Sequence, residues 1–301
     1  MNENQLRFGK ATAVALLGGL FILGLTPHPA HGLFWQWPFS DNQVAVPQIL
    51  GVSSEYPEPQ AIPEQTIKPN TYSKLVVILM YHHVHELSES ERIHNPLLSD
   101  LTVSPEDFEA QVEYLYSSGY HSISAADLYK SIAGGTVLPD KAVVFTFDDG
   151  YEDVFDNAIP VLKKFGYTGS FAVATALLGR PDYATWDDVL AADASGMEIL
   201  SHSDNHLDLT STKYSQDDLK REIYGSKTLL EGNLGHTIDF FVYPYGHQDQ
   251  KIVNLVSEAG YKMAFTTQFG FWMDPNNLLT EPRVRVHGAD GLAKLKKVLP
   301  L

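Results

Sequence analysis

The sequence alternates, over most of its length, between short apolar runs and longer amphipathic segments. Six runs rich in Val, Ile and Phe have the length and composition of buried β-strands, and helical segments separate most of them. Strands that alternate with helices form parallel sheets joined by right-handed crossovers. Such a series of units favours an α/β fold of the incomplete TIM-like barrel type over an open sheet. The predicted strands are residues 75–80, 142–147, 169–174, 197–200, 238–243 and 262–266.

The N-terminal quarter of the chain differs in composition from the rest. A basic start precedes an uncharged, mostly apolar run at residues 11–25, and a small-x-small cleavage sequence follows it. A membrane-spanning helix needs about 20 apolar residues. We therefore expect residues 1–32 to be a signal peptide, or an N-terminal membrane anchor if uncleaved. Residues 33–73 read as a proline-rich linker, and residues 74–301 form the predicted folded domain.

Charge and cysteine content exclude several classes of function. The formal net charge of −16 argues against nucleic acid as a partner, because nucleic-acid binding relies on Lys and Arg. It also disfavours docking on anionic lipid, so membrane contact is expected only through the N-terminal segment. A neutral or cationic substrate is easier to reconcile with this charge. The absence of cysteine removes disulfides, thiolate nucleophiles and Cys-ligated zinc.

Polar side chains with catalytic chemistry follow several predicted strands, at or just past the point where each strand ends. They are His82, Asp148, Asp149, His202 and Tyr245. In a β/α barrel the carboxyl ends of the strands meet at one face, and the active site is built there. These positions therefore predict an enzyme active site at that face.

The two histidines His202 and His206 lie four residues apart, a spacing that lets two imidazoles share a cation on a helical turn or a curved loop. An Asp from another strand end would complete three ligands with open positions, which suits catalytic zinc and also non-haem Fe(II). Asp148 and Asp149 end an apolar strand, where two like charges are costly unless one meets a cation. The simplest division is that one binds metal and the other is a general base. A solvated acidic turn is the alternative.

Three motifs resemble those of the NodB-homology polysaccharide deacetylases, carbohydrate esterase family 4. They are Thr-Phe-Asp-Asp-Gly at 146–150, Ser-His-x-x-x-His at 201–206 and Phe-Val-Tyr-Pro-Tyr-Gly at 241–246. The resemblance covers the chain from about residue 74 to the C-terminus. It implies a distorted (β/α)7 barrel that removes acetyl groups from N-acetylated sugars, or in some members from O-acetylated xylan.

The resemblance also implies roles for individual residues. Asp148 would be the general base, and the backbone N–H of Tyr245 would help to form the oxyanion hole. Pro244 and Gly246 would contact substrate beside Tyr245, whereas Trp186 could line the groove or simply cover the barrel end. The expected cation is zinc, with cobalt, nickel or manganese as alternatives. The implied metal ligands are Asp149, His202 and His206.

Two positions depart from the family pattern. The family has an Arg two residues before the Pro of its third motif, where it orients the base, but this chain has Val242. Loss of that Arg could mean an inactive domain, and it also occurs in the poly-N-acetylglucosamine deacetylase branch. The family's catalytic acid is a His that ends an apolar strand near the C-terminus. Residues 75–82 resemble that motif moved to the front, a circular permutation also seen in that branch. His82 is therefore the expected acid, ahead of His83, with His287 as a rival.

The expected activity is metal-dependent removal of N-acetyl groups from a polysaccharide that contains N-acetylglucosamine, such as peptidoglycan, an exopolysaccharide or a chitin-like polymer. The predicted signal places the protein in the periplasm, the cell envelope or the extracellular space. Two other functions stay open. A glycosidase also uses paired carboxylates, although adjacent ones are poorly placed to flank a glycosidic bond. A non-catalytic glycan-binding module on a degenerate barrel would explain the missing Arg.

Overall fold

The computed structural model describes residues 76–271 and 276–299. The strands of this part are β1 (Val77–Tyr81), β2 (His83–Val84), β3 (Thr102–Val103), β4 (His121–Ser122), β5 (Ala142–Phe147), β6 (Ser170–Val173), β7 (Glu198–Ser201), β8 (Phe240–Val242), β9 (Met263–Phe269) and β10 (Glu281–Arg285). Strands β5 to β10 pair in order and all in parallel, and β1 pairs with both β10 and β5. These seven strands of the described part therefore close a ring, which confirms the predicted distorted (β/α)7 barrel.

The barrel is closed by the strand that comes first in the chain. In β1, Leu79 is in register with Val284 of β10 on one side and with Phe145 of β5 on the other. The short strand β4 adds to the outer edge of β5, and β2 pairs with β3 in a separate small sheet. The position of β1 between the last strand and β5 is what the proposed circular permutation requires.

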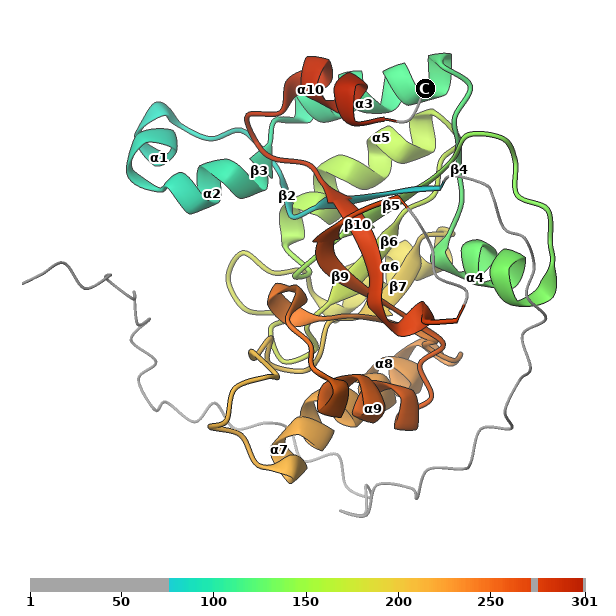
Figure 1. Cartoon of the computed structure of the whole chain (residues 1–301). Helices are drawn as coiled ribbons and strands as arrows, with labels where there is room; N and C mark the ends of the chain where they lie inside the picture. The colour runs from blue at the N-terminus through green and yellow to red at the C-terminus, as the bar shows by residue number, and fades with distance from the viewer. Residues whose placement is uncertain (1–75, 272–275, 300–301) are drawn as a thin grey trace, which may run out of the picture. The chain divides into compact units, whose positions relative to one another are not determined.

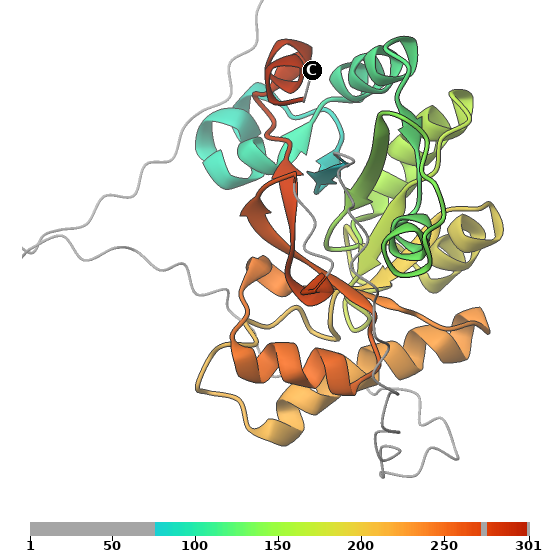
Figure 2. The same cartoon turned by 45° about the vertical axis from the view of Figure 1, so that its right-hand side comes forward.

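Helices surround the ring on its outside. Figures 1 and 2 both show α3, α5 and α10 together on one side of the barrel, α8 and α9 on another, and the pair α1–α2 projecting beyond β3. The helices are α1 (Glu89–His94), α2 (Pro96–Leu101), α3 (Pro105–Ser117), α4 (Ala125–Gly134), α5 (Ile159–Lys164), α6 (Trp186–Ala194), α7 (Gln216–Lys220), α8 (Ser226–Leu234), α9 (Gln250–Glu258) and α10 (Gly291–Val298). Shorter turns are the π-helical η1 (Val154–Ala158) and η2 (Arg221–Gly225) and the 3₁₀-helical η3 (Pro244–Gly246) and η4 (Leu278–Thr280).

Helix ends follow the local sequence signals. The side chain of Ser104 accepts a hydrogen bond from the backbone N–H of Asp107, and Pro105 is the first residue of α3. Gly166 follows α5 with φ 70°, and Gly260 follows α9 with φ 85°. Both glycines adopt the left-handed conformation that ends a helix. These helix ends therefore carry the residues that are typical of helix starts and stops.

Two apolar layers form because alternate side chains of each strand point to opposite faces. One layer joins the strands to α3, α5 and α9 on the outside of the ring. The other fills the inside of the barrel together with residues of α4. Its members include Ile78, Val144, Leu200, Val242, Phe265, Leu128 and Ile132. The ring of Tyr129 on α4 lies 6.1 Å from that of Phe240, the first residue of β8, so α4 lies at the N-terminal end of the barrel.

The same alternation points several polar residues to the open end. Asp148 lies four residues beyond Val144 of the inner layer, and His202 lies two residues beyond Leu200. Both side chains are buried. Together with His82, which directly follows β1, they occupy the C-terminal mouth of the barrel, where enzymes of this architecture build their active sites.

The predicted signal and linker, residues 1–73, lie outside the described residues. Among the helices that the structure does describe, none is both long enough and apolar enough to cross a membrane.

Candidate metal centre and active site

Three potential metal ligands meet at the mouth of the barrel. Asp149 follows β5, His202 follows β7, and His206 lies at the far end of the loop that begins at His202. Asp149 Oδ1 is 3.2 Å from His202 Nε2 and 3.1 Å from His206 Nε2. Their ligand atoms all lie within 4.8 Å of one another. Residues separated by more than 50 positions thus present one oxygen and two nitrogens to the same point.

The donor chemistry of this set fits a divalent cation. His202 Nδ1 lies 2.7 Å from the backbone oxygen of Val242, which can only accept a hydrogen bond, so Nδ1 carries the proton. In the neutral imidazole, Nε2 is then an unprotonated acceptor, and it faces the carboxylate of Asp149. Two acceptors that face each other are held together by a cation, and a backbone partner on the far ring nitrogen is typical of metal-bound histidine.

Electrostatics keeps Asp149 ionised. Burial would raise the pKa of this carboxyl, but the close contacts with the imidazoles of His202 and His206 outweigh the burial and hold its pKa well below the ordinary value. For His206, burial lowers the pKa of the imidazole, and the interaction with Asp149 more than reverses this. The negative carboxylate is therefore available as a ligand across the neutral pH range.

The loop between the two histidines is fixed from both sides. Ser203 and His206 have φ of 64° and 55°, a conformation that non-glycine residues adopt only when their surroundings impose it. The backbone N–H of His206 donates to Ser203 Oγ at 3.1 Å. On the outer side, the buried carboxylate of Glu222 in η2 accepts from the backbone N–H of Asn205 at 2.8 Å and from its side-chain amide at 2.9 Å. The sequence offered no signal for Glu222.

The second carboxylate, Asp148, pairs with a residue that sequence reasoning missed. The two terminal nitrogens of the Arg283 guanidinium, Nη1 and Nη2, donate to Oδ1 and Oδ2 of Asp148, both at 2.7 Å. Arg283 also donates to Thr146 Oγ1 at 2.9 Å and has no exposed surface. Burial raises the pKa of Asp148, but the charge and hydrogen bonds of Arg283 outweigh it, so the pKa lies below its ordinary value.

Arg283 supplies a guanidinium, the group that the family pattern has at the position of Val242. Val242 is buried in the inner layer, at the position where the family pattern has its Arg. The guanidinium comes instead from β10, two strands away around the ring. A signal was present in the sequence, because Arg283 and Arg285 alternate with apolar residues in a strand-like segment of a strongly acidic chain. Arginines at alternate positions of a buried strand need an acidic partner.

The two candidates for the catalytic acid have different surroundings. His82 Nδ1 is buried and has no hydrogen-bond partner among the described residues. Burial lowers the pKa of this imidazole, while the charges of Asp149 and Asp148 raise it, so His82 interacts with both carboxylates. His287 Nδ1 instead lies 2.9 Å from Asp100 Oδ1 on α2, at a partly exposed position. The structure brings His82 to the cluster and pairs His287 with Asp100.

The third motif forms the turn η3 beside the ligand loop. Tyr245 has φ 60°, and its ring lies 4.7 Å from that of His206, with about half of the residue exposed (54%). A Cβ at Gly246 would lie 2.1 Å from Thr267 Oγ1, so only glycine allows this turn to approach β9. Pro244 is buried at the start of the turn. Trp186 begins α6 and packs, partly buried, against the outer apolar layer.

Known proteins share this sequence pattern. A family model for polysaccharide deacetylase matches residues 136–264. YxkH of Bacillus subtilis (strain 168), a candidate polysaccharide deacetylase, is 27% identical over 209 residues, which are 69% of this chain and 70% of that protein. The poly-beta-1,6-N-acetyl-D-glucosamine N-deacetylase of Escherichia coli (strain K12) is 24% identical over 251 residues. That alignment covers 70% of this chain and 36% of the Escherichia coli protein.

A solved structure shares the fold as well. The deacetylase PplD of Streptococcus pyogenes, in complex with acetate, matches with a TM-score of 0.69 and 27% sequence identity. The match covers 75% of this chain and 99% of that one. The family model spans the carboxylate pair, both histidines and Tyr245, whereas β1 and β10 lie outside it. Residues 136–264 therefore match the polysaccharide deacetylase family, and the chain is similar to named deacetylases in both sequence and fold.

Proposed function

We propose that the protein is a metal-dependent hydrolase that removes N-acetyl groups from a polysaccharide containing N-acetylglucosamine. One observation carries the proposal: an Arg-paired carboxylate, Asp148, directly precedes a carboxylate that meets two imidazoles at the barrel mouth. The names of the relatives, a poly-N-acetylglucosamine N-deacetylase among them, support the substrate class. The donor set of two nitrogens and one oxygen supports zinc, and cobalt, nickel and manganese suit it less specifically.

Asp149, His202 and His206 would hold the cation. In such a site a divalent cation supplies Lewis acidity and lowers the pKa of water from about 15.7 toward 7. Asp148 would accept the proton of the attacking water. Each of its oxygens accepts one N–H from Arg283 and keeps a further lone pair for this task. The same ion pair fixes the carboxylate in one orientation, which general base catalysis requires.

His82 and Tyr245 would complete the reaction. The backbone N–H of Tyr245 would donate to the acetyl oxygen as negative charge develops on it, a type of interaction whose loss costs about 10²–10³ in rate. The proposed role of His82 is to protonate the leaving amine of the sugar. Burial, together with the charges of Arg285 and Arg283, lowers the pKa of His82 and outweighs the opposite effect of the two carboxylates. Its proposed role therefore rests on its position beside Asp148 and Asp149.

The substrate surface would surround this mouth. The exposed ring of Tyr245, with Pro244 and Gly246 in the same turn, would contact the sugar, and we keep Trp186 as a more distant candidate. A net charge of −16 suits a neutral glycan or one that gains positive amines as deacetylation proceeds. We further propose that residues 1–32 direct export or anchor the protein, that residues 33–73 act as the linker, and that residues 74–301 form the catalytic domain.

Acetate release from a panel of glycans tests the proposal. Purified protein would be incubated with poly-N-acetylglucosamine, peptidoglycan and chitin oligomers, with and without a chelator, and both free acetate and chain length would be measured. We expect acetate release that the chelator stops and zinc restores, with chain length unchanged. Shorter chains without acetate would establish a glycosidase instead. Glycan binding without either product would establish a non-catalytic module.

A further inference from the structure

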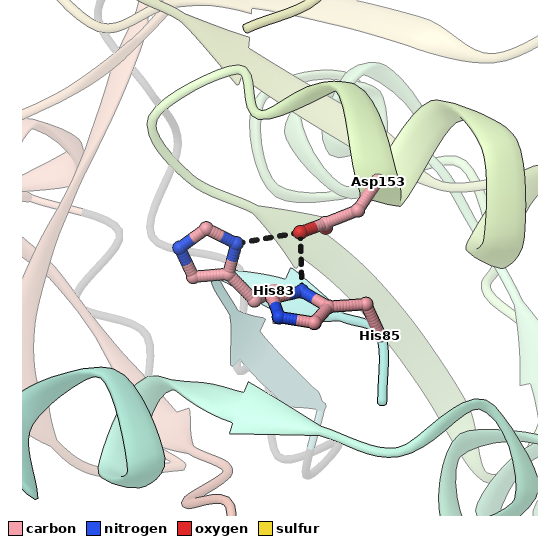
Figure 3. A group of neighbouring side chains, drawn as sticks. All are labelled: His83, His85 and Asp153. Carbon is pink, nitrogen blue, oxygen red and sulfur yellow. Dashed lines mark hydrogen bonds and ion pairs between the residues drawn. The ribbon is translucent and has the colours of Figure 1, made fainter. Parts of the chain in front are cut away.

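A second group of metal-binding side chains lies outside the proposed active site. Within the residues that the structure describes, two sets of three His, Asp or Glu side chains bring their ligand atoms together. One is the set at the proposed active site, and the second consists of His83, His85 and Asp153. His83 Nδ1 and His85 Nδ1 approach the same oxygen, Oδ2 of Asp153, at 2.6 and 2.7 Å. Figure 3 shows both imidazoles turned with one nitrogen toward this carboxylate.

The local backbone holds the three side chains in place. Val84, between the two histidines, donates its backbone N–H to the other oxygen of Asp153 at 3.1 Å. Its carbonyl accepts from the side chain of Asn157 at 2.8 Å. The ring of His83 is stacked on that of Tyr151, with 3.7 Å between ring centres. Partners of this kind orient ligands and are typical of metal sites.

The charge of Asp153 lacks a permanent partner. Its side chain is 19% exposed, and within the described part its ion pairs are with the two histidines alone. Burial raises the pKa of Asp153, but its hydrogen bonds with His83, Val84 and His85 hold it below the ordinary value, so the carboxylate is ionised. No Lys or Arg side chain of the described part pairs with this negative charge. A divalent cation compensates it and uses all three ligands. We propose that His83, His85 and Asp153 bind a second divalent cation, of which zinc suits the two nitrogens and one oxygen best.

Binding needs only a small rearrangement. The present N···O distances are those of hydrogen bonds, in which both Nδ1 atoms carry protons. For zinc, each neutral imidazole carries its proton on Nε2 instead, and Nδ1 becomes the ligand. Bonds of about 2.0–2.1 Å in tetrahedral geometry place the ligand atoms slightly farther apart than they lie here. His85, with 29% of its side chain exposed, leaves an open side at which water supplies the fourth ligand.

The site is distinct from the first. The two sets share no residue, and Tyr151 contacts one member of each, Asp149 of the first set and His83 of the second. His83 directly follows His82, and a cation here would fix the segment that leaves β1. The inference does not depend on the proposed deacetylation, because it concerns metal content and stability only.

Zinc stoichiometry tests the second site. The full chain, free of any affinity tag, would be equilibrated with excess Zn²⁺, freed of unbound metal, and analysed by mass spectrometry for zinc per chain. We expect two zinc ions for the wild type, one for His85→Ala, one for Asp149→Ala and none for the double variant. The exposed histidine His94 of α1 provides the matched control, because His94→Ala should keep both.

Thermal unfolding gives a second, independent measurement. Because a ligand that binds only the folded state stabilises it, added Zn²⁺ should raise the unfolding temperature of Asp149→Ala, and Asp153→Asn combined with Asp149→Ala should remove that rise. One zinc per chain in the wild type, or two in His85→Ala, would overturn the second site. If the wild type holds one zinc that Asp149→Ala loses, the proposed active site stands and the second site fails.

Discussion

Outside the proposed metal ligands, Arg283 is the residue on which the candidate active site depends most. It has no exposed surface, and it donates to both oxygens of Asp148 inside the barrel. A fork of this kind fixes the plane of a carboxylate as well as its charge, which the single point charge of a lysine does not do. The Arg missing at Val242 thus has a counterpart on a different strand that contacts Asp148.

Replacement of Arg283 by leucine should destabilise the protein strongly. The variant leaves the carboxylate of Asp148 buried without a partner, which typically costs about 3–5 kcal/mol. The free energy of unfolding in urea measures this loss. Arg283→Leu combined with Asp148→Asn should recover part of it, because no buried charge remains. Arg221→Leu, which removes an exposed pair with Asp218, is the control and should cost about 1 kcal/mol or less. Equal losses for Arg283→Leu and Arg221→Leu would contradict the account.

Stability should depend on the ionisation of Asp148. Burial alone would raise the pKa of this carboxyl, but Arg283 lowers it below the ordinary value. A group with a lower pKa in the folded than in the unfolded state binds a proton on unfolding, so its contribution to stability is complete above about pH 4 and is lost as the pH falls further. Asp148→Asn should therefore lose less free energy of unfolding than the wild type as the pH falls from about 5 to about 2.5. An equal loss in both proteins would show that the pair does not shift this pKa.

Side chains that the sequence placed at strand ends do meet in the structure, because the alternation of a strand and the parallel arrangement of a barrel are both local rules. This reasoning predicted that Asp148, Asp149 and His202 lie close together, although the pairing of the strands was not known. It missed Glu222, for which the sequence carries no signal, and Arg283, whose alternation with apolar residues indicates a buried cation but not its partner. Each of these acts through a contact with a residue far away in the chain, and no local pattern specifies such a partner.

At the scale of elements, the loop that carries the second imidazole depends on the π-helical turn η2. Two backbone N–H groups at the end of β6, those of Thr175 and Ala176, bind the carbonyls of Ser203 and Asp204, while Glu222 holds the loop from the other side. Irregular π-helical turns occur frequently at functional sites. Here the turn brings a carboxylate to the loop that positions His206.

Removal of Glu222 should weaken metal binding without touching a ligand. Glu222→Ala deletes both acceptors of Asn205, and loss of such supporting groups typically lowers metal affinity by about 10–100-fold. Competition with a chelator of known affinity measures the change. Glu222→Gln keeps one acceptor and should fall between the alanine variant and the wild type.

Glu113→Ala on the exposed face of α3 is the matched control and should leave zinc affinity unchanged. Far-ultraviolet circular dichroism would establish that each variant is folded. A folded Glu222→Ala protein with wild-type zinc affinity would refute the positioning role of Glu222.

Long elements were predictable from the sequence, and short ones were not. The strand β5 formed over the residues predicted for it, because a run of five apolar residues and one threonine, with β-branching, is a strong signal. The strands β2, β3 and β4 contain two residues each, too few for any periodicity to register. The continuous helical segment from Gln216 to Leu234 forms as α7, η2 and α8, and the pattern of apolar residues does not distinguish a π-helical turn from an α-helical one.

At the scale of the whole molecule, closure of the barrel brings the two ends of the domain together at the site. β1 carries His82 and β10 carries Arg283, and these strands pair with each other although they lie at opposite ends of the described chain. The family model matches the region between them, which holds the ligands and Asp148. The sequence indicated the permuted order of the strands by an apolar run near the start of the domain that ends in His. In the structure, this run forms β1, which pairs with both β5 and β10.

The most direct test of the central claim measures zinc content and acetate release on the same samples. Asp149→Ala and His206→Ala each remove one ligand from the proposed centre. We predict that each variant loses one bound zinc per chain and its acetate release on poly-N-acetylglucosamine together, while His94→Ala keeps both properties. Full acetate release, or an undiminished zinc content, in either ligand variant would contradict the assignment of the metal centre.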